Sequence, residues 1–192
     1  MSSIYGGMVA GPNAIKYLDG LEKTVDDIPS SLFDSRLKEE EATFDQLLNM
    51  KGEENAYQIH KELGEWMTDN VTVVRDNAKL LKTDEKIQEL LERWENININ
   101  DSSRWNNQGV MFTRQLKNML HLARVITQGA YNRNESRGGA HYKPEFPDRN
   151  DEEWLKTTKA TFDRTTNAPK FEYEDVDVSL IPPRKRDYTK KK

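Results

Sequence analysis

The residues of this chain with the most distinctive chemistry lie in one loop, between Asn132 and Trp154. Glu135 and Arg137 stand two residues apart, and a pair of glycines and then His141 follow them. A carboxylate and a guanidinium at this spacing form ion pairs of fixed geometry, and glycine permits the backbone turns that proline restrains. We expect Glu135, Arg137 and His141 to be docking residues. A purely structural loop stays open as the alternative, because guanidinium–carboxylate pairs commonly pin loops.

No other group of titratable residues has a spacing that supports catalysis or metal binding. His60 and His121 have no Cys, Asp or Glu at the spacing of metal ligands. The acidic runs 39–41 and 53–54 are interpreted as a solvated helix face and a turn, because adjacent carboxylates point apart on a helix. The sequence therefore predicts no catalytic residue and no metal ligand.

The glycines near the N-terminus do not form a phosphate-binding loop. No strand precedes Gly6, Gly7 and Gly11, and no Lys-Ser or Lys-Thr pair follows them at the required distance. Pro12 is expected to kink or restart the helix that contains them. We predict no cofactor-binding residue in this chain.

The elements that position the loop are predicted to be long amphipathic helices. Apolar residues recur at spacings of three and four in segments 29–52, 55–94 and 103–133, and the second helix is expected to run or bend through Thr83-Asp84-Glu85, which has a capping signature. Segments 156–162 and 170–178 alternate instead and predict a β-hairpin, which should lie on the bundle or pair with a strand of another domain. The predicted fold is mainly α, an antiparallel three-helix bundle (spectrin-repeat-like) with a C-terminal β-hairpin extension.

Composition narrows the possible partners. The 192 residues are 35% hydrophobic and 32% charged, with a net charge of −4 and no cysteine. The mixed charges argue against a nucleic-acid surface, and no apolar run reaches the about 18 residues of a spanning helix, so we predict no nucleic acid and no direct membrane insertion. The absence of cysteine excludes disulfides and iron–sulfur ligation by this chain and fits a cytoplasmic location. The basic residues of segments 184–186 and 190–192 are interpreted as a solvated tail.

Several segments together resemble a known family. The run Asn134-Glu-Ser-Arg-Gly-Gly-Ala-His141 and segment 145–155 resemble the C-terminal domain of succinate dehydrogenase and fumarate reductase flavoprotein subunits. Segments 101–107 and 116–123 resemble the helix that enters this motif, and segment 4–11 resembles the helix that closes the flavin domain. The resemblance covers nearly the whole chain. Its departure is the doubled glycine before Ala140, where many relatives carry one, which bears on the reach of His141.

The resemblance implies a division of the chain into three parts. Residues 1–28 correspond to a remnant of the last helix of the FAD-binding domain plus a linker, with the last flavin-contacting segment ending near Ser3. Residues 29–134 correspond to the helical bundle, and residues 135–192 to the docking loop, the hairpin and the basic tail.

The resemblance also implies a role inside a larger enzyme. The parent subunit oxidises succinate to fumarate with FAD and passes electrons through an iron–sulfur subunit to quinone. Its flavin and substrate residues lie upstream, so this chain alone is expected to bind no FAD and to be inactive. The implied partners are the FAD-binding and capping domains and, through the parent, the iron–sulfur subunit and the membrane anchor. The parent is expected to be peripheral on the cytoplasmic face of the membrane.

Two alternatives remain open. The same domain of a fumarate reductase or an L-aspartate oxidase has the same motifs, and substrate profiling of a complete subunit separates them. A free-standing helical protein-interaction module belongs to a different functional class. Binding to a flavoprotein that lacks this domain distinguishes that module from a docking domain.

Overall fold

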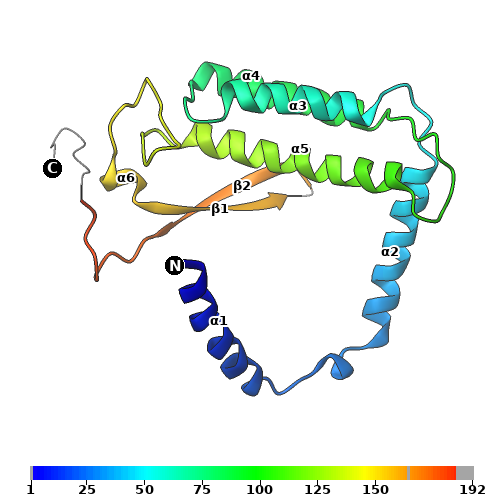
Figure 1. The fold of residues 1–192 in the computed structure, drawn as a ribbon, viewed down its shortest axis with the longest axis horizontal. Coiled ribbons are helices and arrows are strands. Elements are labelled where there is room, and N and C mark those ends of the chain that lie inside the picture. The colour runs from blue at the N-terminus through cyan, green and yellow to red at the C-terminus, as the bar shows by residue number, and fades with distance from the viewer. Residues whose placement is uncertain (1, 164, 185–192) are drawn as a thin grey trace. The chain divides into compact units, whose positions relative to one another are not determined.

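The computed structural model describes residues 2–163 and 165–184 and divides the chain into two compact units, Met1–Gln46 and Leu47–Lys192. Most of the predicted basic tail, residues 185–192, lies outside the described residues. Figure 1 shows the order of the elements along the chain.

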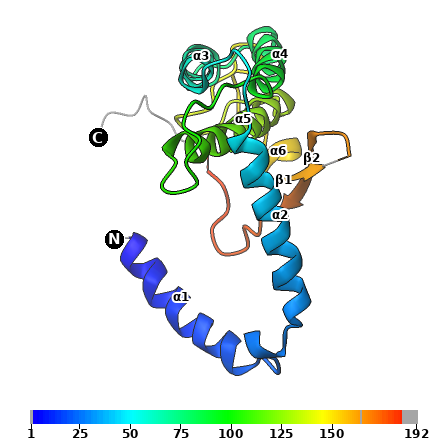
Figure 2. The ribbon, with the colours of Figure 1, turned by 90° about the vertical axis from the view of Figure 1, so that its right-hand side faces the viewer.

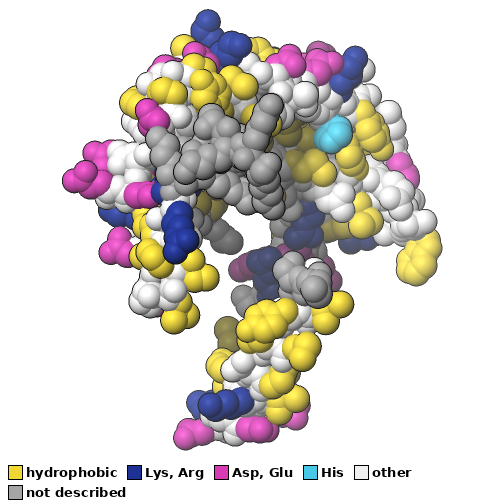
Figure 3. Space-filling model, turned by 60° about the vertical axis from the view of Figure 1, so that its left-hand side comes forward, with side chains coloured by type: hydrophobic (Ala, Val, Ile, Leu, Met, Phe, Trp, Pro, Cys, Tyr) yellow, Lys and Arg dark blue, Asp and Glu magenta, His cyan; other side chains and the backbone are white. Residues whose placement is uncertain are grey.

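The first unit is helical. Helix α1 (Ser2–Asp19) runs through Pro12 without a restart, and a 3-10 turn, η1 (Val25–Asp27), precedes α2 (Ser30–Leu48). The backbone N–H of Thr24 donates to the carboxylate of Asp27 at 2.7 Å, which caps the 3-10 turn. Helix α1 exposes a large share of its apolar side chains, namely Ile4, Tyr5, Met8, Ile15, Tyr17 and Leu18. Figure 3 shows hydrophobic side chains on the surface of the molecule in yellow. Such a surface is typical of a helix that packs against other protein.

The second unit is built on three antiparallel helices, α3 (Ala56–Asn70), α4 (Asn77–Trp94) and α5 (Gln108–Asn132). Figure 2 views them nearly end-on, with α3 and α4 beside each other and α5 against both. Their facing sides supply fully buried side chains: Ile59, Leu80, Ile87, Leu90, Leu116 and Leu120. The prediction of a mainly α protein with a three-helix bundle and a hairpin is confirmed. Of the three predicted segments only 103–133 corresponds to a single helix of this bundle, α5.

The predicted helix 55–94 is two helices, which are separated at residues 71–76, and the second of them runs through residues 83–85 without a break. The chain leaves helical geometry at Val71, and Asp76 starts α4 by accepting a hydrogen bond from the backbone N–H of Lys79. The break falls in a run rich in β-branched residues, which have lower helix propensity. Thr83 is instead fully buried inside α4, where its hydroxyl donates to the carbonyl of Lys79 at 2.8 Å. A capping residue type in a helix interior can satisfy its hydroxyl in this way.

The predicted hairpin is confirmed. Strands β1 (Lys156–Asp163) and β2 (Ala168–Asp175) pair antiparallel, with Lys156 opposite Asp175 and Asp163 opposite Ala168. A short helix, α6 (Asp151–Trp154), leads into β1, and the hairpin lies along α5 (Figure 1). Contact is close because α5 has a glycine there: a Cβ on Gly129 would lie 3.4 Å from the ring of Phe171. The hairpin thus gains the apolar support that two strands need.

Candidate docking loop

The loop after α5 is folded back on itself. The backbone N–H of Arg137 donates to the carbonyl of His141 at 2.9 Å, and Gly138 turns the chain between them with φ of 65°. This φ lies in the left-handed region, which glycine adopts without the steric cost of a Cβ. Ser136 ties the loop further, because its hydroxyl donates to the carbonyl of Phe146 at 2.7 Å. The sequence run that looked like a docking loop is therefore a compact structure.

Glu135 is the centre of this loop and is completely enclosed. Its carboxylate accepts hydrogen bonds from Arg133 Nη1 at 2.6 Å, from Arg137 Nε and Nη2 at 2.8 and 2.9 Å, and from the Asn150 backbone N–H at 3.1 Å. Burial alone would raise the pKa of Glu135, but the bonds from Arg137, Asn150 and Arg133 outweigh it and hold the pKa below its ordinary value. The carboxylate is therefore ionised at neutral pH.

Arg137 connects the enclosed carboxylate to the surface. Besides Glu135 it contacts Asp151 at 2.7 Å, and Asp151 in turn contacts Arg149 at 2.7 Å. The bond to Glu135 is the main reason that the pKa of Arg137 is raised above its ordinary value. Arginine and carboxylate thus alternate from the interior outwards, which joins the loop to the start of α6.

His141 lies beside this chain of ion pairs and does not contact Glu135 or Arg137 through its ring. Its Nδ1 is 2.7 Å from Arg75 Nη1, and its Nε2 is 3.3 Å from the carbonyl of Arg133. Because a guanidinium can only donate, Nδ1 is the acceptor and the ring is neutral with its proton on Nε2. Burial, followed by the charge of Arg75, lowers the pKa of His141 and favours this form.

The structure thus brings the side chains of Glu135 and Arg137 into direct contact. His141 is bonded to Arg137 through the backbone, and its ring faces Arg75 and Arg133. The structure also adds residues that sequence reasoning did not select, namely Arg75, Arg133 and Lys143. Lys143 is fully buried, and its Nζ donates to the carbonyl of Tyr131 at 2.8 Å near the end of α5. No local pattern marks a buried lysine, because lysine is almost always exposed. Arg133 could have been found from its place two residues before Glu135.

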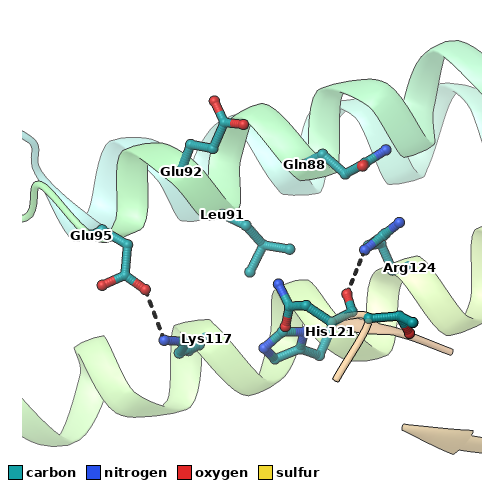
Figure 4. Close-up of a pocket in the computed structure, with 9 residues that line it drawn as sticks. Gln88, Leu91, Glu92, Glu95, Lys117, His121 and Arg124 are labelled. Carbon is teal, nitrogen blue, oxygen red and sulfur yellow. Dashed lines mark hydrogen bonds and ion pairs between the residues drawn. The ribbon is translucent and has the colours of Figure 1, made fainter. Parts of the chain in front are cut away.

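A second group of charged residues lines a cavity of about 400 Å³ between α4, α5 and the hairpin turn (Figure 4). Lys117 contacts Glu95 at 2.9 Å, and Arg124 contacts Asp84 at 3.1 Å and the carbonyl of Asn167 at 2.9 Å. His121 shares this cavity, and its ring packs on Phe162. Its pKa is lowered by burial and then by Lys117 and Arg124. The cations here are already paired, so the cavity offers no strong group for a ligand.

The arrangement of the loop is that of an ion-pair clamp. Within residues 2–163 and 165–184 no cluster of three or more His, Asp or Glu side chains is placed to hold a metal ion. The carboxylate of Glu135 faces three guanidinium nitrogens and a backbone N–H, so it is a charge anchor rather than a proton acceptor.

Comparison with known proteins decides the family. The family model described as "Fumarate reductase flavoprotein C-term" matches residues 60–188, which include most of the bundle, the loop and the hairpin. The chain belongs to this family. The resemblance inferred from the loop sequence is therefore confirmed.

Similar proteins agree with this membership. The chain is 68% identical over 192 residues to the succinate dehydrogenase flavoprotein subunit of Bacillus subtilis, and 35% identical over 191 residues to a fumarate reductase flavoprotein subunit of Helicobacter pylori. The two alignments include 100% and 98% of this chain, but only 33% and 26% of the two relatives. The chain thus spans about a third or less of the length of these relatives.

A solved structure shares the fold. The chain superposes on a variant of Escherichia coli quinol fumarate reductase FrdA with a TM-score of 0.78 and 29% identity, over 83% of this chain and 27% of the other. The helical bundle with its hairpin is therefore the fold of the corresponding part of that protein.

The glycines of α1 do not fit the phosphates of a flavin nucleotide by themselves. Gly6, Gly7 and Gly11 lie inside the helix, whereas a dinucleotide cradle places glycines in the turn between a strand and a helix. A Cβ on any of the three would meet no atom of the described structure within 4 Å. We assign no flavin contact to them. A helix long and apolar enough to cross a membrane is not found among the described residues.

Proposed function

We propose that this chain is the C-terminal structural and docking domain of a succinate dehydrogenase flavoprotein subunit. The observation that carries the proposal is the 68% identity, along its whole length, with the Bacillus subtilis subunit of that name. In this proposal the parent subunit oxidises succinate to fumarate with FAD, and electrons leave through an iron–sulfur subunit to quinone. The chain itself supplies no catalytic residue and is inactive alone.

The proposed parts of the chain keep the boundaries inferred from the sequence. Residues 1–28 are a remnant of the last helix of the FAD-binding domain with a linker, residues 29–134 are the bundle, and residues 135–192 are the loop, hairpin and tail. The exposed apolar side chains of α1 support the first assignment, because a helix of this kind buries its apolar side chains against protein.

The docking role of Glu135, Arg137 and His141 is divided between them in this proposal. Glu135 is enclosed and cannot reach another domain, so its role is to position the guanidinium of Arg137 through their ion pair. Arg137 and His141 line an open cavity of about 480 Å³, to which Arg149 and Arg184 add two cations and Asp148 adds one carboxylate. This cationic surface is the part of the loop that meets the FAD-binding or capping domain.

The proposed location and further partners follow from the parent. A succinate dehydrogenase flavoprotein contacts its iron–sulfur subunit and, through it, a membrane anchor, so the parent is peripheral on the cytoplasmic face of the membrane. No contact of this chain with the bilayer is part of the proposal.

A second candidate function is the same domain in a fumarate reductase. The 35% identity with the Helicobacter pylori subunit favours it, and the shared fold with the Escherichia coli enzyme agrees with it. The two candidates differ in the direction of the parent reaction. Rates of succinate oxidation and fumarate reduction by the complete subunit distinguish them.

The test is reconstitution. A flavin-loaded succinate dehydrogenase flavoprotein without its C-terminal domain is titrated calorimetrically with this chain, and succinate-dependent dye reduction is then measured in the mixture. We expect saturable binding and recovered activity. Absence of binding by the folded chain would refute the docking role and favour an independent interaction module.

Two variants locate the contact. Arg137→Ala is expected to weaken binding about tenfold or more, because one charge-assisted pair contributes on the order of 1.5–3 kcal/mol. Lys82→Ala is the matched control, since Lys82 is an exposed cation on α4. Equal affinity of the two variants would show that Arg137 and its loop are not part of the interface.

A further inference from the structure

Arg75 is a cation with no counter-ion among the described residues. It lies in the connector between α3 and α4 and is partly buried, and its Nε donates to the carbonyls of Val71 and Thr72 at 3.1 and 2.9 Å. Its Nη1 meets His141 Nδ1 at 2.7 Å. No carboxylate of residues 2–163 and 165–184 pairs with it. A partly desolvated guanidinium normally has an anionic partner, because burial of an unpaired charge is costly.

A cavity of about 230 Å³ opens in front of this guanidinium. It lies between the connector, α5 and the two strands, and its polar end is formed by Arg75, Arg133 and His141. Neither Asp nor Glu lines it. The rest of the lining is mostly apolar: Val125, Ile126, Gly129, Ala130, Ala160 and Phe171. The cavity therefore has one cationic end and one apolar wall.

The two arginines at the polar end differ in what they have left to donate. Both terminal nitrogens of Arg133 are engaged, since its Nη1 donates to Glu135 and to the carbonyl of Trp154, and its Nη2 donates to the carbonyl of Lys156 and to the hydroxyl of Thr158. Arg75 keeps Nη2 without a hydrogen-bond partner in the described part of the chain.

His141 adds a second weakly used donor. Its Nε2–H meets the carbonyl of Arg133 only at 3.3 Å, near the limit of a hydrogen bond. Arg75 and His141 thus both line one cavity, and each has an N–H group that is unused or weakly used among the described residues.

We infer that this cavity is a carboxylate-binding site. The carboxylate accepts hydrogen bonds from Arg75 Nη2 and from the ring of His141, and the alkyl part of the ligand packs on the wall of Ile126 and Phe171. The planar guanidinium matches a carboxylate. The volume is below the about 300–1,000 Å³ of pockets for larger ligands, so the site takes a short aliphatic acid or a glutamate side chain.

This inference goes beyond the proposed function, because neither the flavin nor the parent reaction enters it. It concerns the 192-residue chain alone and is tested without any other domain. Failure of carboxylate binding would leave the reconstitution experiment unaffected, so the two proposals fail separately.

The experiment is a titration followed by the imidazole NMR signals of the three histidines. Butyrate is the probe for a free acid, and N-acetylglutamate amide is the probe for a protein side chain. Butylamine and butanol share the alkyl part but lack the carboxylate. We expect a saturable shift of the His141 signal with either carboxylate, no such shift with the amine or the alcohol, and unchanged His60 and His121.

Variants test the contacts. Arg75→Gln is expected to raise the dissociation constant about tenfold or more, because it removes the charged donor. Lys117→Gln is the control, since Lys117 lines the other cavity and is a cation too. Arg75→Lys keeps the charge but loses the fork and is expected to bind with intermediate affinity.

The outcomes are decisive in each case. Binding of only one of the two carboxylates supports the site and identifies its source as a free acid or a protein side chain. The inference is overturned if no carboxylate shifts His141 saturably, or if Arg75→Gln binds as tightly as the original chain. Should Arg75→Gln fail to fold, Arg75→Lys and the comparison of butyrate with butylamine decide instead.

Discussion

Replacing Glu135 with glutamine is expected to destabilise the second unit by about 3 kcal/mol. The change is nearly isosteric, so it leaves packing intact and removes the negative charge. Three hydrogen bonds from Arg133 and Arg137 end on this carboxylate, and each then becomes a bond to a neutral amide or is lost. A hydrogen bond to a charged group contributes on the order of 1 kcal/mol more than a neutral one, so three such bonds account for the estimate.

The environment of the two arginines limits this loss. Their side chains are 17% and 28% exposed, against 0% for Glu135, so water can solvate them in part after the change. Arg137 also keeps Asp151, and Arg133 keeps the carbonyls of Trp154 and Lys156. The estimate therefore lies at the lower end of the about 3–5 kcal/mol measured for breaking buried ion pairs.

Urea and thermal unfolding, followed by circular dichroism at 222 nm, measure this effect. A loss of about 3 kcal/mol corresponds to a fall in melting temperature of roughly 6–12 °C for a unit of this size. The matched control is Glu152→Gln, an exposed glutamate in the adjacent α6, which is expected to change the free energy of unfolding by less than about 0.5 kcal/mol.

The stability difference between the original chain and Glu135→Gln is also expected to depend on pH. The pKa of Glu135 is below its ordinary value of 4.5 in the folded chain, so its carboxylate stabilises the fold above that pH. This contribution is lost as the pH falls through the folded pKa. The stability difference between the original chain and Glu135→Gln should be full at pH 7 and shrink in acid below pH 4.5. A difference under about 0.5 kcal/mol at pH 7, or one that grows in acid, would refute the clamp.

Three further substitutions test the packing of two glycines and the burial of Lys143. Gly52→Ala is expected to destabilise the fold by about 3 kcal/mol, because its Cβ would lie 1.9 Å from the backbone oxygen of Asn96. Gly64→Ala, in the exposed middle of α3, is expected to stabilise the fold by about 1 kcal/mol. Equal urea midpoints for the two variants would contradict this prediction. Lys143→Met removes a buried amine whose pKa burial lowers to about 8. Between pH 8 and 10 the unfolded chain therefore binds more protons than the folded chain. The free energy of unfolding of the original chain, measured in urea, should rise by about 2 kcal/mol relative to that of Lys143→Met over this range. A difference that stays constant with pH would contradict the lowered pKa.

Much of the fold was predictable because its signals are local. The apolar spacing of segment 103–133 anticipates α5, and the alternation after residue 155 anticipates the hairpin. The predicted helix 55–94 was wrong at residues 71–76, because its periodic pattern continues on both sides of a break that β-branched residues and the cap at Asp76 produce. Periodicity alone does not separate a bent helix from two helices.

The candidate site was predictable only in part. Glu135, Arg137 and His141 stand close in sequence, so their loop could be selected from residue types and turn residues alone. Their separate roles depend on residues that are distant in the chain. Arg75 reaches His141 across 66 positions, and only the packing of the α3–α4 connector against the loop brings them to 2.7 Å.

The primary structure of this chain thus specifies which segments are helix or strand and which loop carries charge, because these properties depend on neighbours a few residues away. Burial does not follow from it in the same way. Glu135 and Lys143 are fully enclosed and Trp105 is 88% exposed, against the usual preferences of these residue types. Those outcomes depend on which surfaces meet when the bundle, the connector and the hairpin pack, and so does the cavity in front of Arg75.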